Sequence, residues 1–395
     1  MYRLDNTRVL IYSHDSFGLG HLRRCRALAH ALVERYKGVS VLILTGSPII
    51  GRFDFKARVD FVRIPGVIKL HNGDYTSLGL HIRLDQTLAL RESIILNTAK
   101  AFEPDLFIVD KEPLGLQGEV ESTLRMLRDT ECVNVLGIRD VMDEPVKLTK
   151  EWEHKQAFPA LAELYDEIWV YGDESMGNPL QGLPLPSSVP EKMFYTGYLQ
   201  RQLPVHTRSR YLETVERPYL LVTPGGGGDG AEMVDWVLRA YEADPDLPWD
   251  VMFVLGPFMN SQEQQQFMDR AEPLRGVHMI TFDANLESLL SEAAGIVAMG
   301  GYNTFCEILS FDKPALLIPR TEPRQEQLIR ARNASELGLL SMLDPREPHT
   351  TERMLVALRA LPQQSAPSQH MPANMLSGLE QVQCRVKGLL SERID

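Results

Sequence analysis

Short apolar runs alternate with longer amphipathic stretches along the first half of the chain. Consecutive apolar positions are typical of strands that helices cover on both faces of a sheet. The expected strands are 9–12, 39–44, 61–64, 106–109, 133–138 and 168–171, and the expected helices include 21–35, 85–101 and 116–128. This alternation predicts an open parallel sheet wound with helices.

The same alternation starts again after a break in the middle of the chain, where residues 182–190 are rich in Pro, Ser and Gly and residues 200–217 are polar. Beyond the break, the expected strands are 219–222, 251–255, 278–281, 296–298 and 315–318, and the expected helices are 231–243, 286–293, 304–310 and 325–337. We therefore predict an α/β chain of two Rossmann-like, doubly wound domains that face each other across a cleft. The expected bounds are 1–198 for the first domain, 199–217 for a linker, 218–372 for the second domain, and 373–395 for a C-terminal helix that crosses back to the first domain.

Composition and charge narrow the class of protein. The 395 residues include 53 acidic and 41 basic side chains, which gives a net charge of −12 and argues against a nucleic-acid-binding protein. None of the four cysteines lies in a C-x-x-C pair, so we expect neither a zinc site nor a disulfide framework. The N-terminus lacks the pattern of a signal peptide, and no apolar run approaches the roughly 18 residues of a membrane span. We expect a cytoplasmic protein, with peripheral contact at the inner face of a membrane left open.

The first candidate site follows the first expected strand. Gly18 and Gly20 allow a tight turn and a close approach of the backbone to a ligand, and His21 and Arg24 stand at the start of the next helix. His21 has the chemistry of a general base near neutral pH, while Arg24 is suited to an anion or a carboxylate. The alternative is a glycine turn whose histidine only caps the helix.

Two carboxylates, Asp110 and Glu112, follow the expected strand at 106–109. Ligands of open α/β sheets lie beyond the carboxyl ends of the strands, so these side chains are candidates for binding an acceptor or assisting a proton transfer. Glu112 therefore joins His21 as a candidate catalytic residue. A salt-bridged loop is the alternative.

Four consecutive glycines, Gly225, Gly226, Gly227 and Gly228, follow the first expected strand of the second domain. Their exposed backbone N–H groups are suited to cradling a phosphate ahead of a helix. No Gly-Lys-Ser/Thr follows, so the segment is not a P-loop. The alternative is a flexible turn.

A third strand end carries Gly300, Gly301, Asn303, Thr304 and Glu307. Asn303 or Thr304 can cap a helix whose N-terminus faces an anion, and both share a helix face with Glu307. A carboxylate at this place is unsuited to phosphate, but it can accept hydrogen bonds from both hydroxyls of a ribose. A solvated surface glutamate is the alternative.

A fourth strand end, after residues 315–318, carries Arg320, Arg324, Glu326 and Gln327. The two arginines are candidates for a phosphate, and Glu326 and Gln327 are candidates for sugar hydroxyls. A charged loop before a helix is more often simply solvated, so this segment alone decides little.

The third and fourth segments together resemble the donor-binding region of the GT-B glycosyltransferases, and among them the MurG family. The resemblance rests on Gly300, Gly301, Thr304, Glu307, Pro314, Pro319, Glu326, Gln327 and Ala331. The glycine loop is similar to that family's phosphate loop, and residues 282–286 are similar to its base-facing turn. The resemblance implies a GT-B fold and a nucleotide-diphosphate sugar donor, UDP-linked, with no metal and no cofactor.

Carried over by position, the resemblance implies that the glycine loop and Thr304 hold the diphosphate, Glu307 the ribose, and Glu326 with Gln327 the sugar. The full set of expected donor-binding residues is Gly18, Gly20, Gly225, Gly226, Gly227, Gly228, Phe282, Asn285, Leu286, Gly300, Gly301, Asn303, Thr304, Glu307, Arg324, Glu326 and Gln327. The MurG pattern has a glutamine pair at the position of Glu326 and Gln327, and its acceptor loop is not matched. The sugar and the acceptor, whether glycan, lipid-linked or small molecule, therefore stay open.

The turn from Gly18 to Arg24 is also similar to PseG, a family of nucleotide-sugar hydrolases with the same fold. In that family the histidine that matches His21 is thought to activate water. We expect an inverting glycosyltransferase of the hexosyltransferase type, with His21 removing a proton from the acceptor and with Arg24 and Asp110 as further site residues. The alternatives are a nucleotide-sugar hydrolase or epimerase of the same fold, and a non-catalytic partner that binds sugar nucleotides.

Overall fold

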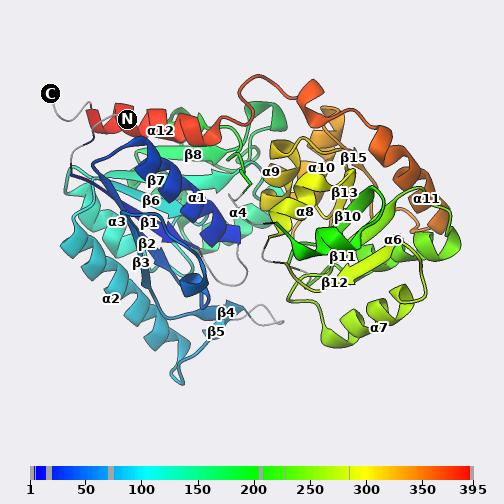
Figure 1. The fold of residues 1–395 in the computed structure, drawn as a ribbon. Coiled ribbons are helices and arrows are strands. Elements are labelled where there is room, and N and C mark those ends of the chain that lie inside the picture. Colours follow the sequence, from blue (N-terminus) through cyan, green and yellow to red (C-terminus); the bar gives the residue numbers. More distant parts are fainter. Residues whose placement is uncertain are drawn as a thin grey trace. The chain divides into compact units, whose positions relative to one another are not determined.

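The computed structural model describes residues 4, 6–14, 20–69, 75–203, 208–226, 228–283 and 285–391, apart from the side chains of Arg52 and Lys69. The chain divides into two compact units (Figure 1). Unit 1 comprises Met1–Glu174, Asn178–Leu199 and Ser377–Asp395, and unit 2 comprises Ser175–Gly177 and Gln200–Leu376. Each unit is built around its own parallel sheet, so each has its own hydrophobic core.

Unit 1 contains a seven-stranded sheet in the order β3-β2-β1-β6-β7-β8-β9, and all of its described pairings are parallel. Its strands are β1 (Thr7–Ser13), β2 (Val39–Thr45), β3 (Val59–Arg63), β6 (Leu106–Asp110), β7 (Val133–Arg139), β8 (Glu167–Tyr171) and β9 (Met193–Tyr195). Every residue of β6 and β8 is buried, as expected for strands with helices on both faces. A separate antiparallel hairpin consists of β4 (Val67–Lys69) and β5 (Tyr75–Ser77).

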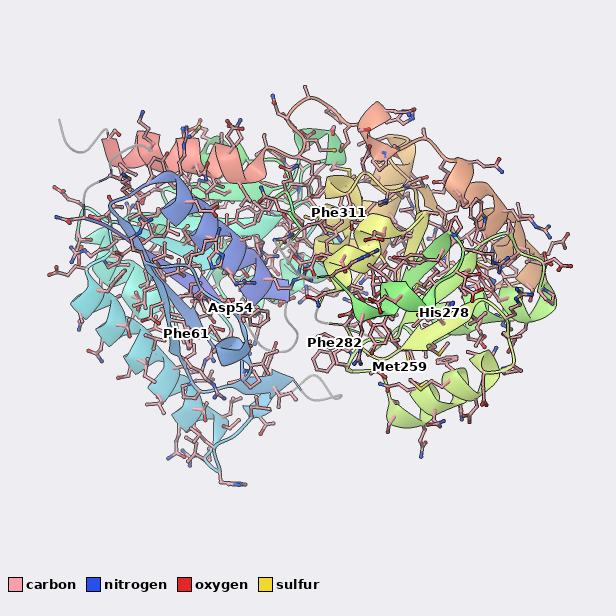
Figure 2. All side chains as sticks on the ribbon, in the orientation of Figure 1. Asp54, Phe61, Met259, His278, Phe282 and Phe311 are labelled. Carbon is pink, nitrogen blue, oxygen red and sulfur yellow. The ribbon has the colours of Figure 1, made fainter. Side chains whose placement is uncertain are left out.

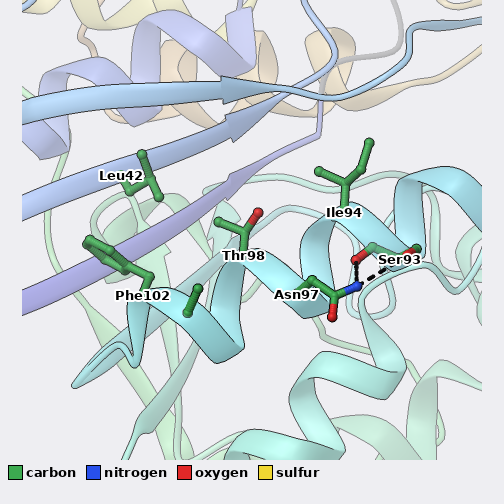
Figure 3. Close-up of a pocket in the computed structure, with 7 residues that line it drawn as sticks. Leu42, Ser93, Ile94, Asn97, Thr98 and Phe102 are labelled. Atoms are coloured by element: carbon green, nitrogen blue, oxygen red, sulfur yellow. Dashed lines mark hydrogen bonds between the residues drawn. The ribbon is translucent and has the colours of Figure 1, made fainter.

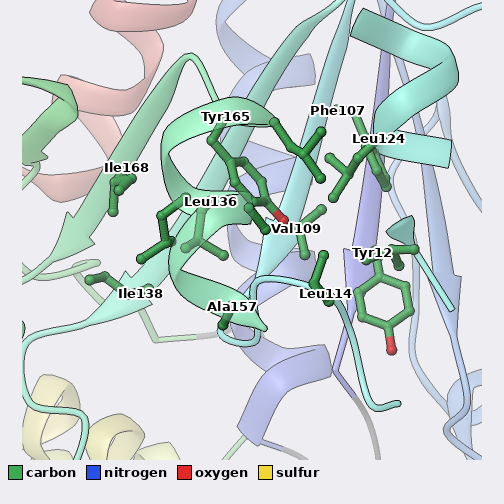
Figure 4. Close-up of a cluster of buried hydrophobic side chains, with 14 of the residues drawn as sticks. Tyr12, Phe107, Val109, Leu114, Leu124, Leu136, Ile138, Ala157, Tyr165 and Ile168 are labelled. Carbon is green, nitrogen blue, oxygen red and sulfur yellow. The ribbon is translucent and has the colours of Figure 1, made fainter. Parts of the chain in front are cut away.

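The helices of unit 1 cover this sheet and enclose its core. They are α1 (Gly20–Arg35), α2 (Leu84–Phe102), α3 (Glu121–Arg128), α4 (Pro145–His154), α5 (Ala157–Glu163) and α12 (Gly378–Ser391). On one face, strand residues such as Phe107 and Leu136 pack with Leu124 of α3 and with Tyr165, which follows α5 (Figure 4). This packing accounts for the continuous apolar runs in the sequence.

Unit 2 repeats the arrangement with a six-stranded parallel sheet in the order β12-β11-β10-β13-β14-β15. Its strands are β10 (Tyr219–Thr223), β11 (Asp250–Val254), β12 (Val277–Ile280), β13 (Gly295–Ala298), β14 (Ala315–Leu317) and β15 (Ser341–Met342). Its helices are α6 (Ala231–Ala243), α7 (Ser261–Ala271), α8 (Leu286–Glu292), α9 (Tyr302–Ser310), α10 (Glu326–Glu336) and α11 (Thr351–Ala360). The predicted α/β class, with a doubly wound parallel sheet in each half, is confirmed.

Helix α12 follows unit 2 in the sequence but packs against α1 of unit 1 (Figure 1). The hydroxyl of Tyr36 donates to the carbonyl of Gln383 at 2.7 Å, and Nε2 of Gln383 donates to the carbonyl of Ala31 at 2.7 Å. A bridge between Leu199 and Ser377 joins the two points where the chain leaves unit 1 and returns to it.

The sequence missed several short elements and misplaced two helix starts. Helix α3 begins at Glu121 and not at residue 116, because Gly115 and Gly118 stand at φ +76° and +93° in the preceding turn. Helix α9 begins at Tyr302 with Gly301 as its N-cap, so the expected cap at Asn303 or Thr304 is wrong. The elements that the sequence did not predict are α4, α5, α7, α11, β4, β5, β9 and β15.

Candidate functional site

The sheet order of unit 1 brings the first candidate residues together. Strands β1 and β6 are neighbours, and the strand order reverses between them. Ligands of open α/β sheets bind beyond the carboxyl ends of the strands at such a switch point. His21 lies on α1, which follows β1, and Asp110 is the last residue of β6. Two residues that are 89 positions apart in the sequence thereby come into contact.

His21, Arg24 and Asp110 form a compact charged group. Nδ1 of His21 lies 2.5 Å from Oδ2 of Asp110. Arg24 donates from Nε to Oδ1 of Asp110 at 2.8 Å and from Nη2 to Oδ2 at 2.9 Å. The side chains of Arg24 and Asp110 are each only 2% exposed, and that of His21 is 18% exposed. The carboxylate is therefore held by a guanidinium on one side and by the imidazole on the other.

The pKa values locate the proton in this group. Burial alone raises the pKa of Asp110, but Arg24 and His21 outweigh burial and hold that pKa well below its usual value. A carboxylate in this state only accepts hydrogen bonds, so the proton in the 2.5 Å contact belongs to Nδ1 of His21. Burial is the main cause that lowers the pKa of His21 to about 4. The ring is then neutral near pH 7, and its lone pair lies on Nε2.

His14 packs against His21, next to the group that His21 forms with Arg24 and Asp110. The two rings meet edge to face with their centroids 5.4 Å apart. His14 is 5% exposed, and its Nδ1 has no hydrogen-bond partner in the part of the chain that the structure describes. Burial, followed by the charge of Lys111, lowers the pKa of His14 well below its usual value. A neutral ring therefore packs against the imidazole of His21.

Glu112, the other expected catalytic residue, lies in an ion-paired setting. It is 2% exposed and stands between Lys111 and Lys155, whose Nζ atoms lie 3.2 Å and 3.1 Å from its two oxygens. This arrangement is the salt-bridged loop that the sequence left as the alternative. Asp110 is the carboxylate that contacts His21. Of the two glycines in the first turn, Gly20 begins α1, and Gly18 lies outside the described residues.

In unit 2 the glycine loop follows β10, whose neighbour across the switch point is β13. Gly225, Gly226 and Gly228 are exposed, and Gly227 lies outside the described residues. Gly225 stands at φ +80°, and its N–H donates to Oγ1 of Thr223 at 3.1 Å. The loop thus presents exposed backbone where a phosphate is expected.

Gly256, which follows β11, lies close against the glycine loop. It stands at φ +90°, and a Cβ atom at this position would lie 2.6 Å from the carbonyl oxygen of Gly225. Nearby, the N–H of Phe258 donates to the carbonyl of Gly226 at 2.9 Å. The two loops can approach this closely only because Gly256 has no side chain.

Helix α9 begins directly after β13. Gly300 is buried at φ +81°, and its carbonyl accepts a hydrogen bond from Nη1 of Arg330 at 3.0 Å. Asn303 and Thr304 are half-buried in the first turn of α9, and Oδ1 of Asn303 accepts from Nη2 of Arg201 at 2.8 Å. Glu307 is 1% exposed, so the alternative of a solvated surface glutamate is wrong.

The segment after β14 is tied to the glycine loop through Arg320. Its guanidinium pairs with Asp229 of the glycine loop and donates to Oε1 of Glu326 at 2.8 Å. Its backbone N–H donates to Oε1 of Gln327 at 3.2 Å. Glu326 and Gln327 are buried at 4% and 7% exposure, while Arg324 is half-buried. The fourth strand end is therefore held by hydrogen bonds and an ion pair, and the interpretation as a simply solvated segment is wrong.

The expected base-facing turn lies after β12. Phe282 is 51% exposed, and Figure 2 shows its ring standing out from the ribbon of unit 2. Asn285 is the N-cap residue of α8, Leu286 is the first residue of that helix, and both are half-buried. An exposed phenylalanine is a candidate platform for a flat ring.

A separate hollow lies between α2 and β2 of unit 1. It has a volume of about 560 Å³ and is lined by Leu42, Ser93, Ile94, Asn97, Thr98, Ala101 and Phe102 (Figure 3). None of these seven residues belongs to the expected site. Among the described helices, none combines the length and the hydropathy that crossing a lipid bilayer requires.

Three further residues that contact the candidate site residues escaped the sequence analysis. Arg330 and Arg201 contact Gly300 and Asn303, as described above. Tyr171, at the end of β8, is fully buried, and the guanidinium of Arg24 lies 5.9 Å from the centroid of its ring. Because Tyr171 ends an expected strand, the strand-end rule could have identified it. Neither arginine follows a strand, so that rule could not have identified them.

Comparison with known proteins identifies the second unit and the fold. Residues 220–383 match the glycosyltransferase family 28 C-terminal domain. An uncharacterized glycosyltransferase of Methanosarcina acetivorans is 24% identical over 347 residues, which cover 84% of this chain and 84% of the relative.

Two solved structures show the same architecture. Acinetobacter baumannii MurG superposes with a TM-score of 0.61 at 12% identity and covers 96% of this chain and 99% of its own. Medicago truncatula UGT71G1, in complex with UDP-glucose, superposes with a TM-score of 0.65 at 12% identity and covers 98% of both chains. At such identities the likeness identifies the fold. With two doubly wound sheets and a match to the family 28 C-terminal domain over residues 220–383, the chain is a glycosyltransferase of the GT-B fold.

Proposed function

We propose that this chain transfers a sugar from a UDP-linked donor to an acceptor hydroxyl, with inversion at the anomeric carbon and with His21 as the base. The observation that carries the proposal is the 2.5 Å contact between His21 and Asp110 at the switch point of unit 1. It leaves the lone pair of a neutral imidazole on Nε2, and no hydrogen bond from the described residues occupies that atom. A histidine in this state is ready to accept a proton.

In the proposed reaction, Nε2 of His21 takes the proton of the acceptor hydroxyl while the hydroxyl oxygen forms a bond to the anomeric carbon. The bond from that carbon to the diphosphate breaks, and its electron pair leaves with the nucleoside diphosphate. Asp110 stabilises the imidazolium that forms. Attack from the face opposite the leaving group inverts the anomeric carbon.

The donor is proposed to bind on unit 2. Exposed backbone of the glycine loop and the N-terminus of α9 are suited to the negative charge that develops on the leaving diphosphate. By the resemblance to the MurG family, Glu307 holds the ribose, Phe282 contacts the base, and Glu326 with Gln327 holds the sugar. The choice of UDP draws support from the bound UDP-glucose of Medicago truncatula UGT71G1. In this proposal the charge is stabilised without a metal.

The donor site is tested by calorimetry with UDP, GDP, ADP, TDP and CMP, each with and without magnesium. We expect UDP to bind, with an affinity that does not depend on magnesium. Truncating the exposed ring in Phe282→Ala removes a stacking surface, and the expected loss of affinity is about five- to tenfold. Absence of binding by any of the five nucleotides would contradict the donor proposal.

The base is tested with His21→Ala, and His30→Ala on the same helix is the matched control. The release of UDP from UDP-glucose is measured with p-nitrophenol or a long-chain alcohol as the acceptor. We expect His21→Ala to bind UDP as the native chain does but to lose turnover by a factor of about 10² to 10⁴. Normal turnover in His21→Ala would remove His21 from the mechanism.

Hydrolysis is the second candidate, because a base positioned for a hydroxyl can also deprotonate water. Release of free glucose from UDP-glucose without an acceptor, at a rate equal to that of transfer, would favour the hydrolase. The acceptor itself is proposed only as a molecule with a free hydroxyl group. We propose a cytoplasmic location, supported by four cysteines of which none forms a disulfide among the described residues.

A further inference from the structure

Arg24 does more than neutralise a buried charge. It lies three residues after His21 on α1, is almost fully buried, and reaches both oxygens of Asp110. We propose that Arg24 is a positioning residue, whose two hydrogen bonds aim Oδ2 of Asp110 at Nδ1 of His21 and so keep Nε2 open for the proton of the acceptor. The inference deepens the proposed function and rests on it only for the role of Nε2.

The geometry explains why a single contact would not be enough. The carboxylate of an aspartate rotates easily about its last torsion angle. One hydrogen bond from His21 would leave the plane of that carboxylate undefined. The planar guanidinium matches the carboxylate at two points and fixes the plane. On its other side the guanidinium of Arg24 faces the ring of Tyr171, 5.9 Å from the centroid, which holds the arginine in turn.

Arg24 also acts on the charge of His21, in the opposite sense to Asp110. Its Nη2 lies 3.1 Å from Nδ1 of His21. Burial contributes most to the low pKa of His21, Asp110 opposes it, and the charges of Arg24 and Lys111 lower the pKa further. Among the described residues, the neutral ring of His14 also contacts His21. Removing the charge of Arg24 should therefore raise the pKa of His21.

Two substitutions separate the geometry from the charge. Arg24→Met removes both, whereas Arg24→Lys keeps the charge but cannot hold two oxygens at once. Arg26→Met is the matched control, because Arg26 lies on the same helix and donates to the carbonyl of Asp54 at an exposed position. If Arg24→Met does not fold, Arg24→Lys decides, because it leaves no unpaired carboxylate in the interior.

The readout is nitrogen NMR of the full chain labelled at histidine, with His21 assigned through His21→Ala. In the native chain we expect the proton on Nδ1. In Arg24→Met we expect a mixture of the two tautomers and a pKa of His21 that is higher by about one unit or more. In Arg24→Lys we expect the same mixture with a smaller change of pKa. In both variants kcat should fall at least about tenfold, while KM for UDP-glucose stays unchanged.

The outcomes distinguish this inference from the proposed function. If both Arg24 variants keep the native tautomer and the native pKa of His21, Arg24 does not position the dyad and the inference is wrong. If the NMR signals change as expected but His21→Ala keeps its turnover, the positioning stands and the base assignment fails. If Arg24 has only a structural role, Arg24→Lys should lower the stability of the chain without changing the tautomer of His21.

Discussion

Replacing Asp110 by asparagine keeps the size of the side chain and removes its charge. In the native chain the carboxylate accepts two hydrogen bonds from Arg24 and one from His21. In Asp110→Asn, one oxygen becomes an NH₂ group that faces these donors. The guanidinium of Arg24, 2% exposed, then loses the negative charge of Asp110 that both of its hydrogen bonds reach.

The expected loss of stability follows from this burial. Removing one partner of a buried ion pair costs about 3–5 kcal/mol, because the other charge stays desolvated and unpaired. A chain the size of unit 1 has an m-value of about 2–3 kcal/mol per molar urea, so the unfolding midpoint of unit 1 should fall by about 1–2.5 M. We expect unit 2 to keep its midpoint, since Asp110 belongs to the core of unit 1.

The assay is hydrogen–deuterium exchange by mass spectrometry across a urea series. Peptides of unit 1 and unit 2 are read separately, which is needed because a chain of two units need not unfold in a single step. Glu121→Gln on α3 is the control: its pair with Arg125 has side chains 40% and 58% exposed. An exposed pair contributes only about 0.2–1 kcal/mol.

A double variant tests the reasoning itself. Asp110→Asn combined with Arg24→Met removes both charges, so the midpoint of unit 1 should recover most of the loss seen in Asp110→Asn alone. If Asp110→Asn unfolds at the same urea concentration as Glu121→Gln, breaking the buried pair costs no more stability than breaking an exposed pair, and the expected penalty is refuted. If the double variant recovers nothing, the loss does not come from burying the charge of Arg24 without that of Asp110.

Two further predictions concern the pH dependence and the glycine loop. The pKa of His21 lies near 4 in the folded chain and near 6.5 when unfolded, so unfolding takes up a proton between these values and the free energy of unfolding falls by about 3 kcal/mol from pH 6.5 to pH 4. A His21→Asn variant should lose less over that window in urea titrations, and an identical slope would contradict the assignment. In Gly256→Ala the new methyl group would lie 2.6 Å from the carbonyl oxygen of Gly225, so UDP affinity should fall about tenfold or more by calorimetry. Gly51→Ala, whose methyl group meets nothing within 4 Å, should bind UDP normally, and equal affinities in the two variants would show that the loop does not hold the nucleotide.

The sequence predicted the strands well because a strand that is buried on both faces of its sheet consists of consecutive apolar residues. It also placed His21 correctly after β1, and it placed Asp110 at the carboxyl end of β6, of which Asp110 is the last residue. It did not give their contact, which depends on the register that pairs Tyr12 with Val109 across the two strands. Register of this kind is a long-range property, and no local pattern in the chain encodes it.

Local sequence patterns did not predict some other features, such as the burial of Arg91 and the start of α9. Arg91 looks like a surface residue of a helix, yet it is 1% exposed and pairs with Glu119, whose Oε1 lies 2.7 Å from its Nη2. The capping rule favoured Asn303 or Thr304 over Gly301, but the tight turn at Gly300 starts α9 earlier. Short elements such as α5 and β9 have too few residues for a periodic pattern to emerge.

The return of α12 to unit 1 has a consequence for how the chain is made. A ribosome that has released residues 1–199 has not yet supplied the helix that hydrogen-bonds to Tyr36 and Ala31. Unit 1 therefore lacks the helix that packs against α1 until the whole of unit 2 has been synthesised. Its last helix arrives only afterwards, and Arg385 then closes on Glu167 of β8. In the order of synthesis, the half that begins first is completed last.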